Sequence, residues 1–169
     1  MRYLTIALGL SLLLPNLAAA NDGYGFVKLG RTVTSLPEYN TPSTMIIGFG
    51  NEFESSSIEL SYLAFDRFAL HQNYNSYIDL QSSRLSYSQH FDVGWPKLTV
   101  GLSAIYYDAN AFYSNVEIAT EYDFTYGASI GLRFPLGSEF NITMDGDISM
   151  DILGQDLKHF SIGLQKEFR

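Results

Sequence analysis

The sequence predicts an all-β chain that folds as an eight-stranded antiparallel up-and-down β-barrel. Three observations support this prediction: apolar and polar residues alternate along most of the chain, turn residues separate the alternating segments, and aromatic residues are abundant. Of the 169 residues, 15% are aromatic and only 17% are charged, whereas about 25% are charged in an ordinary soluble domain. The absence of cysteine excludes a disulfide framework and a thiolate metal site. A formal net charge of -8 argues against a nucleic-acid partner, because phosphate binding needs a basic surface.

Residues 1–20 have the features of a secretory signal peptide. Arg2 provides a short positive start, Ile6 to Leu14 form an apolar core, and Ala18 to Ala20 supply the small residues that precede a cleavage site. The apolar core is too short to cross a membrane as a helix. We therefore expect cleavage after Ala20 and a mature chain, residues 21–169, that forms a single barrel domain.

The clearest strand signal lies at residues 122–134. Every second residue from Tyr122 to Phe134 is apolar, and the residues between them are small or polar. A helix would scatter these residues around its axis, whereas a strand places them on two separate faces. The segment is also long enough for a tilted strand to cross a bilayer, which takes about 9–11 residues.

Seven further segments complete the barrel in chain order. The first two alternate least clearly and are placed partly by context, the third is apolar at its even positions, and the fourth is weaker. The segments 98–107, 140–150 and 160–168 repeat the pattern of residues 122–134. The eight predicted strands are 24–33, 44–53, 58–66, 77–90, 98–107, 122–134, 140–150 and 160–168.

The connections between these strands alternate in length. Residues 51–56, 92–97 and 135–138 are short and contain the turn formers Gly, Pro, Asn and Ser. Short turns at one end and long loops at the other are typical of outer-membrane barrels, so both termini should be periplasmic. We expect four longer, polar, extracellular loops at 34–43, 67–76, 108–120 and 151–158.

The composition of the two faces predicts which one meets lipid. Small polar residues, which dominate one face, suit the crowded interior of a narrow barrel. Aromatic residues near the strand ends of the other face suit the interfacial girdles of a membrane barrel. A soluble carrier would instead turn its apolar face inward around a ligand and is the alternative. We therefore expect a transmembrane barrel in the cell outer membrane, in contact with outer-membrane lipids and lipopolysaccharide.

Three segments also carry a family likeness. Residues 23–32 (GYGFVKLGRT) contain a Lys-Leu-Gly, and the hairpin 46–65 joins a glycine-rich strand to an acidic residue followed by apolar-x-Tyr. The last strand alternates apolar residues up to a penultimate aromatic, at Phe160, Ile162, Leu164 and Phe168. These segments resemble the small outer-membrane β-barrel family that includes the OmpA transmembrane domain and OmpX.

The resemblance implies a fold more strongly than an activity. Members of this family serve as structural anchors, adhesins, weak pores or, less often, lipid-modifying enzymes. The resemblance also implies that the last strand is an insertion signal, read by the barrel-insertion machinery after delivery by periplasmic chaperones.

Charged residues on the predicted lumen face form the main candidate site. A charge in a narrow lumen is costly to desolvate unless it is paired, so we expect a structural network of ion pairs. Arg84 and Asp145 lie at similar heights and should pair with each other. A pore gated by exchange of these pairs is the alternative. The predicted network comprises Lys28, Glu59, Arg84, Arg133, Asp145, Asp147 and Glu167.

No catalytic centre, cofactor or metal site is expected. His159-Phe160-Ser161 matches the His-x-Ser of lipid A deacylases, but both polar residues should face the lumen, away from lipid acyl chains. Glu167 lies roughly 20 Å further along the strand, too far to orient His159. Asp145, Asp147 and Asp151 lack the tight turn and closing acid of a calcium loop.

The sequence thus predicts a non-enzymatic outer-membrane barrel with a structural or surface-interaction role. A narrow pore is the second hypothesis and a lipid A-modifying enzyme the third. The loops carry no motif that names an extracellular partner.

Overall fold

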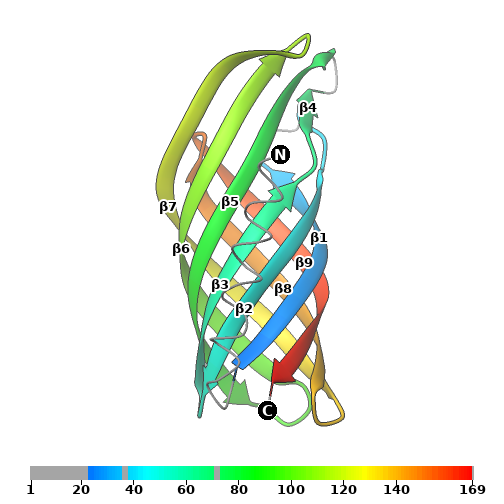
Figure 1. The fold of residues 1–169 in the computed structure, drawn as a ribbon, viewed down its shortest axis with the longest axis vertical. Helices are drawn as coiled ribbons and strands as arrows, with labels where there is room; N and C mark the ends of the chain where they lie inside the picture. Colours follow the sequence, from blue (N-terminus) through cyan, green and yellow to red (C-terminus); the bar gives the residue numbers. More distant parts are fainter. Residues whose placement is uncertain (1–22, 36–37, 71–72, 169) are drawn as a thin grey trace.

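The computed structural model describes residues 23–35, 38–70 and 73–168, so the predicted signal peptide at residues 1–20 lies outside the described residues. The described chain is almost entirely strand (Figure 1). Within it, no helix is long and apolar enough to cross a membrane. The strands are β1 (Gly23–Thr34), β2 (Ser43–Phe53), β3 (Ser56–Phe65), β4 (Phe68–Leu70), β5 (Asn73–Asp92), β6 (Lys97–Tyr113), β7 (Val116–Leu136), β8 (Phe140–Ile152) and β9 (Gln155–Phe168).

These strands close into an eight-stranded antiparallel barrel, as predicted. β1 pairs with both β2 and β9, so the first and last strands form the seam of the ring. β3 pairs with β5, and the three residues of β4 pair with β5 directly beyond it. β3 and β4 therefore occupy one interrupted position in the ring, which reconciles the labelled strands with eight positions. A closed ring leaves no sheet edge along its paired part.

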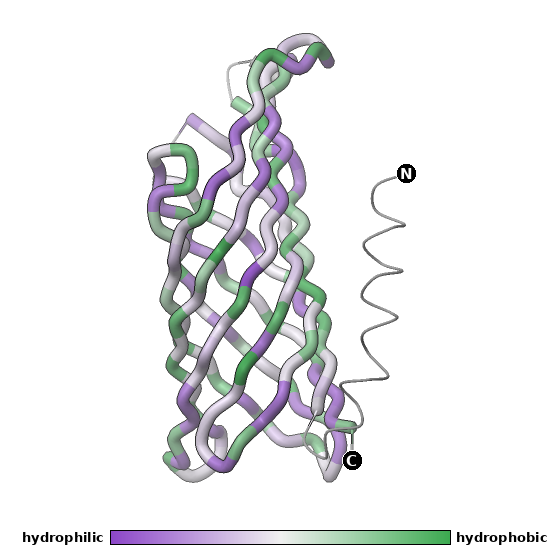
Figure 2. Tube along the Cα trace, turned by 60° about the vertical axis from the view of Figure 1, so that its left-hand side comes forward, coloured by the Kyte–Doolittle hydropathy of each residue, from purple (hydrophilic) through white to green (hydrophobic). Residues whose placement is uncertain are grey.

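The faces also lie as predicted, with apolar residues outward and small polar residues inward. Along β1, Val27 and Leu29 are exposed whereas Thr32 is fully buried. Figure 2 shows the resulting alternation of hydrophobic and hydrophilic positions along the strands. The inner face nevertheless holds two apolar clusters. One consists of Tyr24, Phe26, Ile46 and Leu63, and the other lies nearer the outer end of the barrel.

Three of the four predicted loops are wrong in extent. The segment predicted as a loop at 108–120 is a continuation of β6 and β7, joined by a two-residue turn at Ser114 and Asn115. Both turn residues have positive φ (50° and 65°), as tight hairpins of this kind require. The segment 151–158 is likewise a hairpin, which turns at Leu153 and Gly154 with φ of 55° and 72°.

The remaining connections comprise the third loop that is wrong in extent and four connections that agree with the sequence. The predicted loop at 67–76 contains β4 and the start of β5, whereas 34–43 is the connection between β1 and β2. The three predicted tight turns, at 51–56, 92–97 and 135–138, overlap the shorter β2–β3, β5–β6 and β7–β8 connections at 54–55, 93–96 and 137–139. Turn residues therefore mark every reversal of the chain, but they do not show how far the strands run before it.

The longer strands give the barrel an uneven outer rim. β5, β6 and β7 rise beyond the other strands at the top of Figure 1. β7 pairs with β6 from Val116 to Arg133 but with β8 only from Gly127 to Leu136. Residues 116–126 of β7 therefore form a sheet edge without a neighbouring strand among the described residues. We call this segment the free edge.

The opposite side of the protruding sheet is covered. β4 pairs with β5 there, and Tyr39 forms a bridge to Leu70 of β4. The Asn40 side chain binds β4 and the residue before it, because its Nδ2 donates to the Arg67 carbonyl (3.1 Å) and its Oδ1 accepts from the Ala69 N–H (2.9 Å). The protruding sheet thus has one covered edge and one free edge.

Candidate functional site

The lumen contains three ion pairs among the described residues. Lys28 Nζ lies 2.9 Å from Asp145 Oδ2, and Arg84 Nη1 lies 2.5 Å from Asp147 Oδ1. Arg133 Nη1 lies 2.5 Å from Glu52 Oε2. The second pair joins β5 to β8 and the third joins β7 to β2, so both cross the lumen. These side chains tie distant parts of the wall together through the barrel interior.

The predicted pairing of Arg84 with Asp145 is wrong. Arg84 pairs with Asp147, because Asp145 is bound by Lys28. Lys28 and Asp145 are on strands separated by β9, where Lys28 lies opposite Gly163 and Asp145 lies opposite Ser161. The lysine therefore reaches diagonally across β9. Counting residues from the end of each strand does not reveal this contact, because the count omits the stagger between strands.

Two glycines make room for the Lys28–Asp145 pair. A Cβ at Gly163 would lie 2.5 Å from Lys28 Cγ, and a Cβ at Gly131 on β7 would overlap the Asp145 carboxylate. By contrast, a Cβ at Gly146 would have its nearest neighbours at 3.9 Å. The Asp145 carboxylate therefore lies against Gly131 and the Lys28 side chain against Gly163, where a larger residue would leave no room for them.

The other predicted lumen acids bind neutral donors. The Tyr24 hydroxyl donates to Glu59 Oε1 (2.6 Å), and the Arg133 guanidinium lies 5.5 Å from the centre of the Tyr24 ring. Asn141 Nδ2 donates to Glu167 Oε1 (2.9 Å). Tyr24 therefore links Glu59 to Arg133, whereas Glu167 is bound by the Asn141 amide.

Glu52 is the lumen charge that sequence reasoning missed. Residues 51–56 were interpreted as a turn, but β2 continues to Phe53 and the chain turns only at 54–55. Glu52 continues the inward series of Ile46, Gly48 and Gly50. Extending the two-residue period past the first turn residue would have placed it in the lumen.

His159 and Ser161 face the lumen and are both buried. His159 Nδ1 lies 3.0 Å from Thr32 Oγ1, which in turn lies 2.7 Å from Thr44 Oγ1. Within the described part of the chain, neither His159 Nε2 nor Ser161 Oγ has a hydrogen-bond partner. A hydrolytic centre needs a base that contacts the nucleophile and is oriented by a third group. Thr32 binds His159, but Ser161 Oγ does not, so the contact between base and nucleophile is missing among these described residues.

The described residues also contain no group of three or more His, Asp or Glu side chains placed to hold a metal ion. The acids at 145 and 147 are each engaged by a cation of the chain itself. The space left between the ion pairs is about 40 Å³, enough for only a few water molecules.

The predicted insertion signal lies on the last strand of the seam. Phe160, Ile162 and Leu164 point outward from β9 and are about half exposed, and Phe168 pairs with Gly23 at the start of β1. These residues thus contribute to the outward apolar surface at the point where the ring closes.

Barrel closure, an outward apolar face and an inner polar network define the fold of small eight-stranded outer-membrane β-barrel proteins. Among solved structures, Neisserial surface protein A (NspA) superposes with a TM-score of 0.67 at 12% identity, over 86% of this chain and 96% of that one. The N-terminal β-barrel domain of Pseudomonas aeruginosa OprF gives 0.66 at 12% identity, over 88% and 98%. The attachment invasion locus protein Ail of Yersinia pestis gives 0.63 at 12% identity, over 88% and 99%.

No protein-family profile matches the sequence, and no curated protein is significantly similar to it. The similarity to the solved structures therefore concerns the fold.

Proposed function

We propose that this protein is a non-enzymatic barrel of the bacterial outer membrane whose free edge binds an extended segment of a partner protein. The proposal rests on the run of β7 residues that pair with β6 on one side and, in the described part of the chain, with no strand on the other. An unpaired edge offers a row of N–H and C=O groups to an incoming strand.

The membrane location is supported by the outward surface. Apolar side chains project from every part of the ring, and Ile130, Leu102 and Leu164 are each about half exposed or more. Such a surface would be costly in water over so large an area. The solved structures that share the fold include outer-membrane proteins, which supports the same location. Export would then depend on the signal peptide at residues 1–20, cleaved after Ala20.

Outer-membrane lipids and lipopolysaccharide would surround the barrel. During biogenesis, periplasmic chaperones and the barrel-insertion machinery would act on the apolar last strand.

The part of the free edge that is open to a partner is residues 116–123. Immediately beyond it, the Phe124 N–H is bonded to the Asp123 carboxylate (2.7 Å). The Thr125 hydroxyl binds the Met150 carbonyl of β8. Eight open residues are more than an average strand length of about 5–6. A partner segment of ordinary strand length can therefore pair along this edge.

The chemistry of the edge indicates what the partner segment carries. Glu117, Glu121 and Asp123 make the edge acidic, while Ile118 and Tyr122 expose apolar side chains. Opposite charges directly across a strand pair stabilise it, and like charges destabilise it. A segment that alternates basic and apolar residues fits this edge, whereas a second copy of the same acidic edge does not.

The acidic edge also argues against a polyanionic partner. Ail has been solved in complex with the heparin analogue sucrose octasulfate, but that property belongs to Ail. On this chain, sulfate groups would meet carboxylates at the free edge.

A pair of synthetic peptides tests the proposal. A peptide of alternating Lys and Val and a matched peptide of alternating Glu and Val would be titrated against the full barrel in lipid nanodiscs. We expect the basic peptide to bind about tenfold more tightly, since two cross-strand charge pairs contribute up to about 1 kcal/mol each. The double variant Glu117→Lys with Asp123→Lys should reverse the preference. Asp156→Lys, on the β8–β9 side of the mouth, is the control and should not reverse it. Equal binding of both peptides, or none, would contradict the proposal.

Two other functions are tested separately. A pore would require the lumen ion pairs to separate, because only about 40 Å³ is open between them. Planar-bilayer recording should therefore show no steady conductance from the refolded barrel. Incubation with lipopolysaccharide followed by mass spectrometry of the lipid should show no change in mass, since His159 and Ser161 lack the contacts of a hydrolytic centre.

A further inference from the structure

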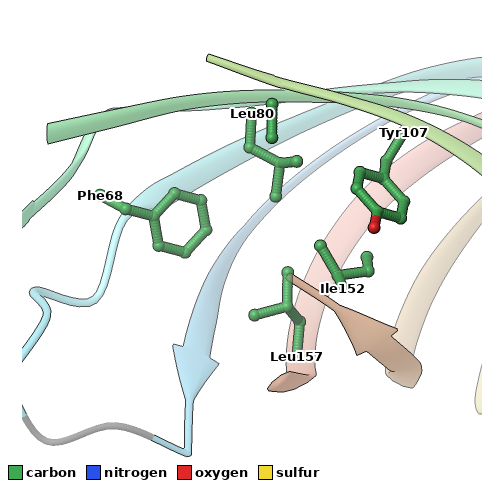
Figure 3. Packing of buried hydrophobic residues seen from close by; sticks show 6 residues of the cluster. Phe68, Leu80, Tyr107, Ile152 and Leu157 are labelled. Atoms are coloured by element: carbon green, nitrogen blue, oxygen red, sulfur yellow. The ribbon is translucent and has the colours of Figure 1, made fainter. Parts of the chain in front are cut away.

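The outer mouth of the barrel contains a second, larger cavity, separate from the ionic part of the lumen. Its volume is about 250 Å³. Phe68, Leu80, Ile152 and Leu157 form an apolar floor, and Figure 3 shows these side chains converging from β4, β5, β8 and β9. Ala109 and Ala119 are among the small residues of the wall. The cavity exists because this wall carries methyl groups where larger side chains would fill the space.

One charged group lines this cavity among the described residues. It is Glu121 of β7, whose Oε1 accepts a hydrogen bond from the Tyr107 hydroxyl (2.8 Å). Tyr107 is buried in the apolar cluster beneath. A tyrosine anchored in the floor therefore holds a carboxylate at the wall, and no lysine or arginine lines the same space.

We propose that the mouth cavity binds a small cationic amphiphile, with its apolar part on the floor and its ammonium group at Glu121. The volume exceeds the roughly 150 Å³ of an apolar cavity that holds benzene. It is slightly below the approximately 300–1,000 Å³ of pockets for drug-sized ligands. A single ring or a short alkyl chain therefore fits.

The charge of the wall selects among amphiphiles of that size. An ammonium group near Glu121 gains an ion pair, whereas the carboxylate of a fatty acid would meet a like charge. A neutral alcohol can hydrogen-bond to the Glu121 carboxylate without gaining an ion pair. The expected order of affinity is therefore amine, then alcohol, then acid. Glu121 and Ala119 belong to the free edge, but the proposal rests on side chains that line the mouth and not on strand pairing by the backbone of that edge.

Three probes that share an octyl chain test this order: octylammonium, octanol and octanoate. Each would be titrated against the full barrel in lipid nanodiscs while the methyl resonances of the alanines are followed by nuclear magnetic resonance. Octylammonium should shift Ala109 and Ala119 saturably and bind at least about tenfold more tightly than octanoate. The outward-facing methyl of Ala104 reports partitioning into lipid and should shift without saturating. Equal shifts at Ala104 and Ala109 for every probe would overturn the proposal.

Variants separate the apolar and charged parts of the site. Glu121→Gln should remove the preference for octylammonium over octanol while octanol binding persists. Ala109→Leu should abolish binding of both by filling the cavity, whereas Ala104→Leu, the matched outward change, should leave both unchanged. Ala119→Leu adds bulk at an exposed position of the same wall and should also abolish binding, even if Ala109→Leu impairs folding. An unchanged preference in Glu121→Gln would show that the carboxylate does not select the ligand.

Discussion

The middle of the barrel and its outer mouth are built from the same strands but have opposite interiors, one filled and polar, the other open and apolar. In the middle, small residues and glycines face inward and charged side chains fill the remaining space as ion pairs. At the mouth, the inward residues are apolar, a cavity remains open, and the sheet continues past its neighbours. The hydrogen-bonded β-ladder forms the wall in both regions. The inward side chains alone determine whether the interior is filled, as in the middle, or contains a cavity, as at the mouth.

The largest expected effect tests how much the middle depends on its ion pairs. Asp147→Asn leaves the Arg84 guanidinium buried without its counter-ion, which costs about 3–5 kcal/mol for a fully desolvated pair and less in a hydrated lumen. Urea unfolding in lipid vesicles measures this loss. Adding Arg84→Met should recover part of it, and strictly additive effects in the double-mutant cycle would show that the two residues do not interact.

The second prediction asks which of the two regions lies in lipid. Ile130→Arg places a charge on the outer surface of the middle, where it should destabilise the barrel by about 2–4 kcal/mol if that surface is at the bilayer midplane. Ile118→Arg, at a similarly exposed position on the protruding hairpin, should cost little. Folding yields in lipid vesicles compare the two variants, and equal losses would place both positions in the same environment.

The third prediction concerns the glycines of the middle. Gly163→Ala should destabilise the barrel by about 1–3 kcal/mol, because the new methyl group would overlap the Val27 carbonyl oxygen and Lys28 on β1 and force repacking. Gly146→Ala meets nothing closer than 3.9 Å and is the control. Urea midpoints of the two variants should differ, and a loss of equal size at both positions would point to backbone effects instead.

The smallest expected effect is at the mouth. Arg67 and Asp79 are 3.8 Å apart, and their side chains are 62% and 40% exposed. Asp79→Asn should therefore change the free energy of unfolding by less than about 1 kcal/mol. A loss as large as that of Asp147→Asn would mean that the mouth is as dry as the middle.

The sequence predicted the middle far better than the mouth, for a physical reason. A strand inside a closed ring has one face toward lipid and one toward the lumen, so residues such as Ile130 and Ser129 differ sharply in chemistry. In β7 above the ring, Glu121 and Tyr122 are both exposed, so alternation no longer separates two environments. The polar composition of 108–120 was therefore interpreted as a loop.

The candidate site shows a similar limit. Alternation placed Lys28, Arg84 and Asp145 on the inner face, but the pairing between them depends on the stagger of neighbouring strands. No periodicity along one strand encodes that stagger. The mouth cavity was missed entirely, because its floor combines residues of β4 and β5 with residues of β8 and β9, which are far apart in the sequence.

The seam between β1 and β9 has a consequence for the time course of folding. Gly23 pairs with Phe168, so the ring cannot close until the last residues of the chain have arrived. Until then the growing sheet has two unpaired edges and an apolar surface. Exposed edges and apolar surface of this kind favour aggregation between chains. Contacts between such distant residues also form slowly. Ring closure therefore competes with aggregation during assembly, and the competition ends only when the last strand, β9, pairs with β1.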